Sequence, residues 1–401
     1  MAMAELEDFD VVVVGGGPAG ATAATDLAGK GARVLLLERA FRIKPCGGAI
    51  PPRLIEDFAI PQHLLVARIR SARMISPANQ RVDMPIADTY VGMVDRETFD
   101  PWLRQRAAQA GAVVRTASYK ALERLEDGRV KLTYLDKAGG GGRVSVLARA
   151  VIGADGARSA VARDSVPAAA ALKCVFAYHE IVRSPDAGDT AADFDPGRCD
   201  VWYQGRLSPD FYAWVFPHGG QTSIGVGSAR RGFSAPDAVR ELRRDVRMDS
   251  AATLRREGAP IPLRPLKRWD DGRNVVLAGD AAGVVAPASG EGIYYAMLGG
   301  RLAADAAAAF LASGDARELK QARRRFMRQH GRVFWILGLL QRFWYVDDRR
   351  REKFVAMCRD PDVQYLTWQA YTRKELVRAR PAAHVRIFFK DLAQLLGLAK
   401  A

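Results

Sequence analysis

The chain has 401 residues, of which 49% are hydrophobic and 26% are charged. This balance is typical of a globular protein large enough for two closely joined domains, and it excludes a disordered chain. The formal net charge of +15 favours an anionic partner such as a membrane lipid, a nucleic acid or a phosphorylated small molecule, without choosing among them.

Charged residues and cysteines narrow the class further. No nucleic-acid-binding motif accompanies the arginines of one expected helix, so we interpret them as a solvated face and expect no bound nucleic acid; they are Arg240, Arg243, Arg244 and Arg247. The cysteines show neither a CxxC pair nor the spacing of a zinc site, which predicts reduced thiols, no metal and a cytoplasmic location; they are Cys46, Cys174, Cys199 and Cys358.

No segment of the chain has the pattern of a targeting or membrane-spanning sequence. The first residues are acidic and lead directly into the apolar run Val11–Val14, so we expect no signal or transit peptide. The longest apolar run, residues 333–345, is interrupted by Gln341 and Arg342 and falls short of the roughly 18 to 20 residues that a spanning helix needs.

The first half of the chain predicts a βαβ opening followed by antiparallel structure. A strand over 9–14, a helix over 18–27 and a strand over 33–38 form the opening. We then expect a hairpin of residues 69–76 and 80–86, a helix over 97–110, and a meander of residues 121–125, 130–135 and 144–148 that turns at glycines 139–142. Residues 151–152 return to the parallel sheet.

The second half begins with strand-like segments rich in Trp, Tyr and Phe between residues 166 and 267. A buried strand follows at 274–277, then a helix of small residues at 290–311, and helices from 319 onward.

A phosphate-binding loop follows the first strand. Gly15, Gly17 and Gly20 give GxGxxG at the start of a helix, where they permit the tight turn, the approach of backbone N–H groups to a pyrophosphate, and the contact of helix with strand. About 20 residues later, Glu38 ends a strand, where a carboxylate accepts hydrogen bonds from ribose hydroxyls. This context favours a dinucleotide site over an ordinary glycine turn.

NAD and FAD both use this fingerprint, and two later segments favour FAD. Residues 152–159, IGADGARS, resemble the DG motif of the glutathione-reductase-type flavoprotein superfamily in its aromatic-hydroxylase branch, with Asp155 as the acid. Residues 275–282, VVLAGDAA, resemble its GD motif, whose aspartate, here Asp280, contacts the ribityl chain. Either segment alone is also typical of a strand that ends in a Gly/Asp turn.

These elements predict an α/β fold in which an antiparallel-sheet substrate domain is inserted into a Rossmann-like FAD-binding domain. We assign 1–68, 87–165 and 268–318 to the FAD-binding domain, 69–86 and 166–267 to the substrate-binding sheet domain, and 319–401 to a C-terminal helical region.

A closer resemblance lies in residues 44–49, KPCGGA, residues 208–217, SPDFYAWVFP, and residues 289–296, SGEGIYYA. They resemble the geranylgeranyl reductase family, most closely its chlorophyll and bacteriochlorophyll branch, over nearly the whole chain. The resemblance implies that reduced flavin N5 delivers hydrides to isolated double bonds of a prenyl chain, giving a phytyl chain, with NADPH as reductant. The implied substrate is a prenyl diphosphate or a prenylated pigment.

The resemblance and the motifs together predict the site residues. Flavin contacts are expected at Gly15, Gly17, Ala19, Gly20, Glu38, Cys46, Gly47, Arg96, Asp155, Asp280, Gly290, Gly292 and Ile293. The substrate cavity is expected to be lined by Tyr212, Trp214, Phe216 and Pro217.

Physical chemistry agrees with several of these roles. A prenyl tail needs an apolar tunnel, which alternating aromatic residues on one strand face provide, although such residues are also typical of an ordinary core. Reduction of an alkene needs a proton as well as a hydride, and Cys46 in its glycine-flanked loop is a candidate donor; a lone cysteine is otherwise a small buried residue. Arg96 precedes a helix and can neutralise a pyrophosphate, and backbone N–H groups near Gly290 and Gly292 can face the flavin.

Three alternatives remain. A flavin monooxygenase of the same fold usually carries a histidine where this chain has Gly283. A geranylgeranyl reductase can also act on membrane lipids or quinones. A non-enzymatic prenyl-binding escort protein need not retain Gly15, Glu38 and Asp280 together.

Two C-terminal stretches predict peripheral attachment to a photosynthetic membrane, because apolar residues at helical spacing stand beside basic residues. Packing against the core or a partner is the alternative. The first stretch is Val333, Phe334, Ile336, Leu337, Leu340, Phe343 and Trp344, followed by Arg349, Arg350 and Arg351. The second is Val385, Ile387, Phe388, Phe389, Leu392, Leu395 and Leu396, flanked by Arg386, Lys390 and Lys400.

Overall fold

A computed structural model describes residues 6–39, 43–166, 169, 172–186 and 193–374. The chain divides into two compact units. The first comprises residues 1–43, 97–174 and 260–338, and the second comprises residues 44–96, 175–259 and 339–401. The second C-terminal stretch expected from sequence, residues 385–400, lies outside the described residues.

The first unit is built on a six-stranded sheet in which five strands run parallel and one runs antiparallel. Four of the parallel strands are β2 (Val34–Glu38), β1 (Asp8–Val14), β10 (Arg143–Gly153) and β16 (Val275–Leu277). On the far side of β2 lies β8 (Val113–Arg124), also parallel to it, and β9 (Val130–Asp136) pairs antiparallel with both β8 and β10. The expected meander and its return to the parallel sheet are confirmed.

Strand β10 pairs antiparallel in its first half and parallel in its second half. Its first half pairs antiparallel with β9, while residues from Leu147 onward pair parallel with β1 and then with β16. The buried pattern of this strand is continuous over its last four residues, as expected for a strand covered on both faces. Parallel strands end at one edge, so the loops after Val14, Glu38, Gly153 and Leu277 meet there.

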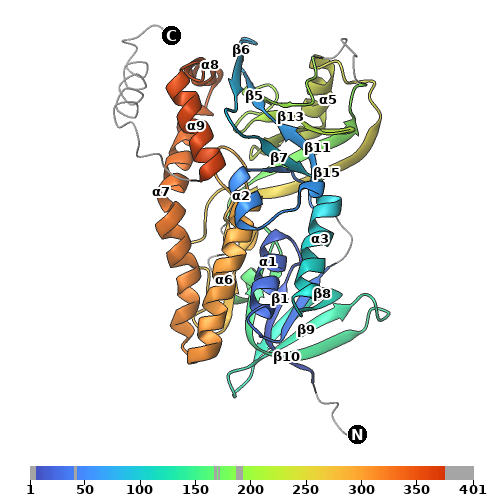
Figure 1. Cartoon of the computed structure of the whole chain (residues 1–401), viewed down its shortest axis with the longest axis vertical. Coiled ribbons are helices and arrows are strands. Elements are labelled where there is room, and N and C mark those ends of the chain that lie inside the picture. Colours follow the sequence, from blue (N-terminus) through green and yellow to red (C-terminus); the bar gives the residue numbers. More distant parts are fainter. Residues whose placement is uncertain (1–5, 40–42, 167–168, 170–171, 187–192, 375–401) are drawn as a thin grey trace. The chain divides into compact units, whose positions relative to one another are not determined.

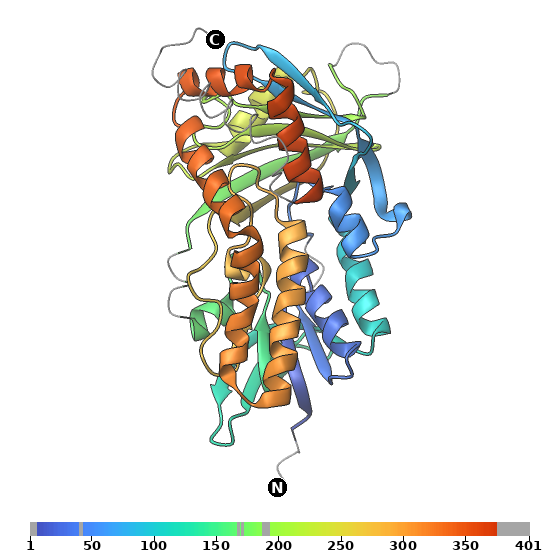
Figure 2. The same ribbon diagram turned by 60° about the vertical axis from the view of Figure 1, so that its left-hand side comes forward.

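Helices α1 (Pro18–Ala28) and α6 (Ile293–Ser313) pack on this sheet and on each other (Figure 1). Their contact requires a glycine, because a Cβ at Gly300 would lie 2.1 Å from the carbonyl oxygen of Ala19. The first part of α7 (Lys320–Trp344) runs beside α6, where Tyr295 meets Phe326 and Phe334 at ring-centroid distances of 6.0 and 4.9 Å (Figure 2). This unit also contains helices α3 (Arg96–Gln109) and α4 (Ala160–Ser165) and the short 3-10 helices η3 (Gly279–Ala282) and η4 (Ala316–Leu319).

The second unit contains a seven-stranded sheet and a small three-stranded one. The larger sheet has the order β15 (Thr253–Pro262), β11 (Cys174–Arg183), β14 (Gln221–Ser228), β13 (Ala213–His218), β12 (Arg198–Trp202), β5 (Ser71–Ile75) and β6 (Arg81–Pro85). Strands β5 and β6 form the expected hairpin. The smaller sheet consists of β3 (Ala49–Ile50), β7 (Val91–Val94) and β4 (Leu65–Ile69), with α2 (Pro52–Asp57) nearby in the chain.

The two faces of the large sheet pack differently. Helix α5 (Ala235–Asp245) covers one face, where Val215, Ile224 and Val226 share a core cluster with Val239 and Leu242. The alternate residues of the same strands point to the other face, where Phe216 and Cys199 pack with residues of α9 (Pro361–Arg373). Helix α8 (Asp348–Met357) precedes α9.

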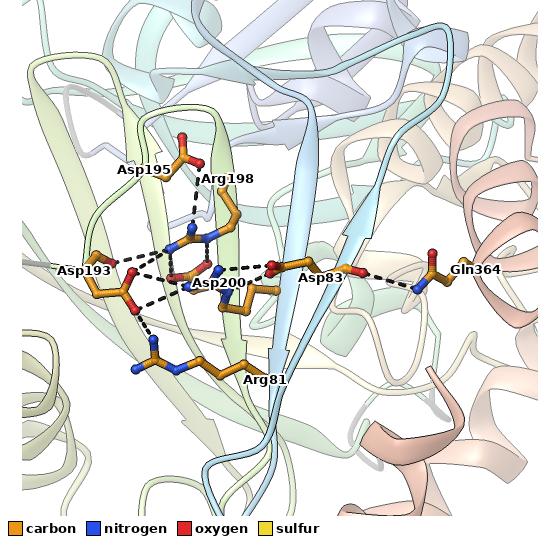
Figure 3. Close-up of polar contacts among 8 residues, drawn as sticks. Arg81, Asp83, Asp193, Asp195, Arg198, Asp200 and Gln364 are labelled. Atoms are coloured by element: carbon orange, nitrogen blue, oxygen red, sulfur yellow. Dashed lines mark hydrogen bonds and ion pairs between the residues drawn. The ribbon is translucent and has the colours of Figure 1, made fainter. Parts of the chain in front are cut away.

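An ion-pair network holds the β5–β6 hairpin to β12 (Figure 3). Arg73 contacts Asp83 at 2.6 Å and Asp193 at 3.3 Å, and the Nε2 of Gln364 in α9 donates to the carbonyl oxygen of Asp83 at 3.2 Å. The hydrogen bond from Arg73 lowers the pKa of Asp83. The remaining members are Arg81, Asp195, Arg198 and Asp200.

Two arginines contradict the sequence-based interpretation. Arg243 was expected on a solvated face, but it is buried and pairs with Glu180 at 2.5 Å while donating to three backbone carbonyl oxygens. Arg351 was expected on a basic membrane-facing run, but it is buried and donates to the carbonyl oxygens of Pro209 and Tyr345. Both cations bind loop carbonyls, which the spacing of charges along a sequence does not reveal.

Candidate active site

The glycine loop after β1 has the geometry that a pyrophosphate requires. Gly15 has a φ of +104°, and its N–H donates to the carbonyl oxygen of Leu37 at 2.8 Å. A Cβ at Gly20 would lie 1.8 Å from the carbonyl oxygen of Gly15, so only glycine lets the helix approach the strand. At Gly17 no atom lies within 4 Å of an added Cβ. The loop therefore leaves open space at the helix N-terminus, which fits a bound phosphate.

Glu38 lies beside this loop and already makes one hydrogen bond. Its Oε2 accepts from the N–H of Gly16 at 2.6 Å, and Arg104 donates to the carbonyl oxygen of Gly16 at 3.2 Å. The carboxylate thus holds the loop while its position at the end of β2 suits a ribose. Arg104 had no sequence signal, because an arginine within α3 resembles any exposed helix residue.

Asp155 caps a helix at the same sheet edge. Its carboxylate accepts from the Ser159 hydroxyl and from the N–H of Ala160 at 2.7 Å, at the start of α4. Burial raises the pKa of Asp155, although these hydrogen bonds act in the opposite direction. The flavin contact expected at Asp155 stays a prediction, and helix capping is the role that its contacts support.

Asp280 and the start of α6 lie together. Asp280 is in the turn after β16, and its Oδ1 would lie 3.9 Å from a Cβ added at Gly292. Gly292 is the N-cap of α6, which has no acidic residue in its first turn. A Cβ at Gly279 would lie 2.7 Å from that of Ala19, which places the GD turn against the glycine-loop helix.

The N-terminus of α6 can serve the cofactor. A 21-residue helix carries unpaired N–H groups and a partial positive charge at its start, which here is Ile293. The preceding loop turns sharply at Gly290, whose φ is +67°. The sequence prediction began this helix at Gly290, and the structure begins it three residues later. The first unit thus brings together Gly15, Gly17, Ala19, Gly20, Glu38, Asp155, Asp280, Gly290, Gly292 and Ile293 at one sheet edge.

The second unit brings the Cys46 loop against the aromatic strand. A Cβ at Gly47 would lie 3.0 Å from the ring of Phe216, and one at Gly48 would lie 2.5 Å from Nε2 of His218. The Cys46 sulfur accepts from the N–H of Gly48 at 3.4 Å. Two motifs that are about 170 residues apart in sequence are therefore in contact.

His218 is neutral in this position. Its Nδ1 lies 3.0 Å from the carbonyl oxygen of Phe216 and so carries the proton, and burial lowers its pKa. The Nε2 lone pair then faces Gly48. Arg96, the first residue of α3, is buried, and its contact with a pyrophosphate stays a prediction.

The aromatic row expected along β13 is present. The ring centroids of Tyr212 and Trp214 are 5.9 Å apart, and those of Trp214 and Phe216 are 6.1 Å apart. Tyr212 and Trp214 are buried, and Phe216 is half-buried. Pro217 follows within the same strand and is buried. Their role in binding substrate stays a prediction.

Sequence reasoning missed a buried polar group beside this row. His179 lies between Ser223 and Glu257, with its ring nitrogens 2.8 and 3.0 Å from their oxygens, and Trp214 Nε1 donates to the Ser223 hydroxyl at 3.0 Å. The only available signal was the alternation of residues along β11 and β14, which places His179 and Ser223 on the aromatic face.

The expected interfacial face is mostly covered. Phe334 and Trp344 are buried, which corrects the prediction that they face a membrane, and among the other expected apolar residues Ile336 is 37% exposed. The more exposed apolar residues, Trp335, Leu339 and Val346 at 70%, 52% and 57%, were not in the predicted set. In the described parts of the chain, no helix is both long and apolar enough to cross a membrane.

Known proteins resemble the chain over nearly its full length. The family described as FAD binding domain matches residues 8–178. A geranylgeranyl diphosphate reductase from Rhodobacter capsulatus is 55% identical over 97% of this chain and 98% of its own length. A geranylgeranyl diphosphate reductase from Synechocystis is 36% identical over 96% of this chain and 97% of its own length. A digeranylgeranylglycerophospholipid reductase from Methanoculleus marisnigri is 34% identical over 77% of this chain and 78% of its own.

Solved structures share the fold. A geranylgeranyl bacteriochlorophyll reductase-like protein from Thermoplasma acidophilum superimposes with a TM-score of 0.80 at 21% identity, covering 94% of this chain and 100% of that one. A flavin-dependent brominase has a TM-score of 0.73 at 17% identity, covering 96% and 99%. The expected aromatic-hydroxylase-like fold is confirmed.

Proposed function

The chain belongs to the geranylgeranyl diphosphate reductase family and is an FAD-dependent oxidoreductase, and we propose that it reduces the double bonds of a geranylgeranyl chain to give a phytyl chain. The substrate is geranylgeranyl diphosphate or the geranylgeranyl tail of a chlorophyll or bacteriochlorophyll. The observation that carries the proposal is the contact of the Cys46 loop with the aromatic row, through Gly47 and Phe216.

The residues of the second unit have distinct parts in this reaction. An isolated alkene offers no polar handle, so the prenyl chain is held by apolar contact along Tyr212, Trp214 and Phe216. Cys46, at the end of this row, supplies the proton to one alkene carbon. Loss of this proton leaves Cys46 as a thiolate. His218 lies against the same loop with Nδ1 protonated, so its Nε2 can take up a proton from solvent and pass it on to the thiolate, which returns both groups to their neutral forms.

The residues of the first unit hold FAD, which supplies the hydride when it is bound and reduced. The N–H groups of the Gly15–Gly20 loop receive the pyrophosphate, Glu38 receives the ribose, and Asp280 with the α6 N-terminus receives the ribityl chain and the ring. We infer that NADPH is the reductant. We assign the first unit, residues 1–43, 97–174 and 260–338, to cofactor binding, and the seven-stranded sheet of the second unit to substrate binding.

The mass of the prenyl product tests the function. The FAD-loaded protein is incubated anaerobically with NADPH and with either geranylgeranyl diphosphate or a geranylgeranyl pigment. Each double bond reduced adds about 2 Da to the product. A gain of about 16 Da under air would indicate instead a monooxygenase, and an unchanged substrate with both compounds would refute the proposal. Comparison of the two substrates shows whether the tail is reduced before or after it joins the pigment.

We further propose that α7 contacts an anionic membrane surface, where such substrates reside. Trp335 and Leu339 share one helical face with Arg328, Arg332 and Arg342 at spacings of three and four residues. None of these arginines makes an ion pair or hydrogen bond with another described residue. An exposed apolar stripe bordered by unpaired cations favours the interface of an anionic bilayer, where each arginine adds about 1 kcal/mol.

Flotation with liposomes tests this surface. The double variant Trp335→Ala, Leu339→Ala should lose binding to vesicles that contain phosphatidylglycerol, whereas the control Phe176→Ala, Leu254→Ala removes two exposed apolar side chains elsewhere, each 45% exposed, and should not. Binding should weaken with added salt. Equal flotation of both variants would remove α7 from the interface.

A further inference from the structure

A chain of hydrogen bonds crosses four neighbouring strands beneath the aromatic row. It begins at Trp214 on β13, whose Nε1–H donates to the hydroxyl of Ser223 on β14 at 3.0 Å. Ser223 Oγ lies 2.8 Å from Nδ1 of His179 on β11, and Nε2 of His179 lies 3.0 Å from Oε2 of Glu257 on β15. Ser223 and His179 are buried.

The chemistry of the groups fixes the direction of every bond. An indole N–H can only donate, so Ser223 Oγ accepts from Trp214. A carboxylate can only accept, so Nε2–H of His179 donates to Glu257, and in this tautomer of the neutral ring Nδ1 accepts the hydrogen of the Ser223 hydroxyl. All donors run toward that carboxylate. Arg255 balances its charge, with Nε 3.2 Å from Glu257 Oε1 and Nη2 3.6 Å from Asp95.

A glycine provides the space in which the indole lies. Gly225 on β14 stands opposite both Trp214 and His179 in the strand register. A Cβ at Gly225 would lie 2.2 Å from Cζ2 of Trp214 and 2.6 Å from Cβ of His179. The indole therefore rests on the backbone of Gly225, and its N–H is directed toward Ser223.

This arrangement differs from what packing alone requires. The opposite face of the same strands packs against α5 with apolar side chains such as Val215, Ile224 and Val226. A buried serine and histidine are costly unless each polar atom is paired, so their presence under one aromatic residue indicates that its orientation matters. Of the aromatic residues in the row, Trp214 carries an N–H that the sheet itself binds.

We propose that Ser223, His179 and Glu257 are positioning residues that fix the Trp214 indole over Gly225, and thereby determine how far a prenyl chain advances along the row and how many of its double bonds are reduced. The inference rests on the proposed function and deepens it. When the indole is fixed, the prenyl chain can advance past Trp214 along the aromatic row. When the indole is free to tilt, it obstructs the prenyl chain, and the reaction stops at partly reduced products.

The NMR signal of the Trp214 indole N–H tests this chain of hydrogen bonds, which we call the relay, and it can be measured without any catalysis. In ¹⁵N-labelled protein the Trp214 Nε1–H signal is identified by its loss in Trp214→Phe. Ser223→Ala should shift this signal and speed its exchange with solvent, because the acceptor is gone. Thr222→Val is the matched control: Thr222 directly precedes Ser223 in β14, is equally buried, and its hydroxyl bonds to that of Ser184 at 2.8 Å on the other face.

Product analysis tests the consequence. Ser223→Ala should lower the ratio of fully to partly reduced product by about tenfold, while its FAD content and its reduction by NADPH stay those of wild type. Glu257→Gln keeps an acceptor for His179 and should preserve the indole signal and the products better than Glu257→Leu does. Adding Glu257→Leu to Ser223→Ala should change the product ratio little further, since the relay is already broken.

An indole signal that is unmoved in Ser223→Ala would overturn the relay. A moved signal with an unchanged product ratio would overturn its role in the extent of reduction. If the wild-type protein reduces no prenyl substrate, the proposed function fails, and the indole signal still decides whether Ser223 holds Trp214.

Discussion

Two glycines of one loop should respond differently to the same substitution. A Cβ at Gly20 would lie 1.8 Å from the carbonyl oxygen of Gly15, against the 3.0 Å below which such contacts essentially do not occur, so α1 must retreat from β1 by at least 1.2 Å. Overpacking of this kind costs about 1–3 kcal/mol. For a domain of this size we expect Gly20→Ala to lower the Tm of the apoprotein by about 3–10 °C.

Gly17→Ala should leave the apoprotein almost unchanged and weaken FAD binding. The added methyl group meets no protein atom within 4 Å, so the change in unfolding free energy should stay within about 0.5 kcal/mol. The methyl group does occupy the space in which a phosphate approaches the α1 N–H groups. Losing one charge-assisted hydrogen bond, about 1.5–3 kcal/mol, raises the Kd by about 10- to 100-fold.

Thermal denaturation of the apoprotein and fluorescence titration with FAD measure the two effects separately. The expected result is a lower Tm for Gly20→Ala and a raised Kd with an unchanged Tm for Gly17→Ala. An unchanged Kd in Gly17→Ala would refute the placement of the pyrophosphate, and an unchanged Tm in Gly20→Ala would refute the close packing of helix on strand.

Three further outcomes are expected. Cys46→Ala should keep FAD and its reduction by NADPH but slow alkene reduction in stopped-flow measurements, with Cys174→Ala, also half-buried, as the unaffected control. Arg243→Met should lower the free energy of unfolding in urea by about 3 kcal/mol, because it removes the buried cation of Glu180 and leaves only the exposed Arg256 beside that carboxylate, whereas Arg240→Met on the exposed side of α5 should change it little. Burial raises the pKa of Glu180, but its hydrogen bonds to arginines lower the pKa overall. Its contribution to the free energy of unfolding is therefore complete above the ordinary pKa of 4.5 and is lost as the pH falls through the lowered value. Glu180→Gln should make the fall of Tm below that pH less steep, and an equally steep fall would contradict this assignment.

The sequence predicted the elements whose signals are local. The glycine loop, the strand before it and Glu38 at the end of the next strand lie within 30 residues, and each has a backbone reason for its residue type. The meander was predictable because the glycines at 139–142 separate two alternating runs. The start of α6 was predicted too early, because Gly290 has a positive φ and belongs to the preceding loop.

The contacts that join distant strands could not be predicted. Glu257 and His179 are 78 residues apart, and only the order of strands β15, β11 and β14 brings them together with Ser223. The burial of Arg351 depends on the carbonyl oxygen of Pro209, which lies 142 residues away in the chain. A basic run in the sequence looks the same whether its cations face solvent or bind a loop.

The double pairing of β10 suggests an order of assembly. Its antiparallel partner β9 adjoins it in the chain, so the meander closes through short loops, whereas β1 and β16 lie more than 100 residues away on either side. Local pairings form before distant ones because they cost less chain entropy. We therefore expect hydrogen exchange during refolding to protect β9 and the first half of β10 early. The edge that receives the cofactor should form only when β16 docks, so that FAD binds a nearly finished domain rather than guiding its first steps.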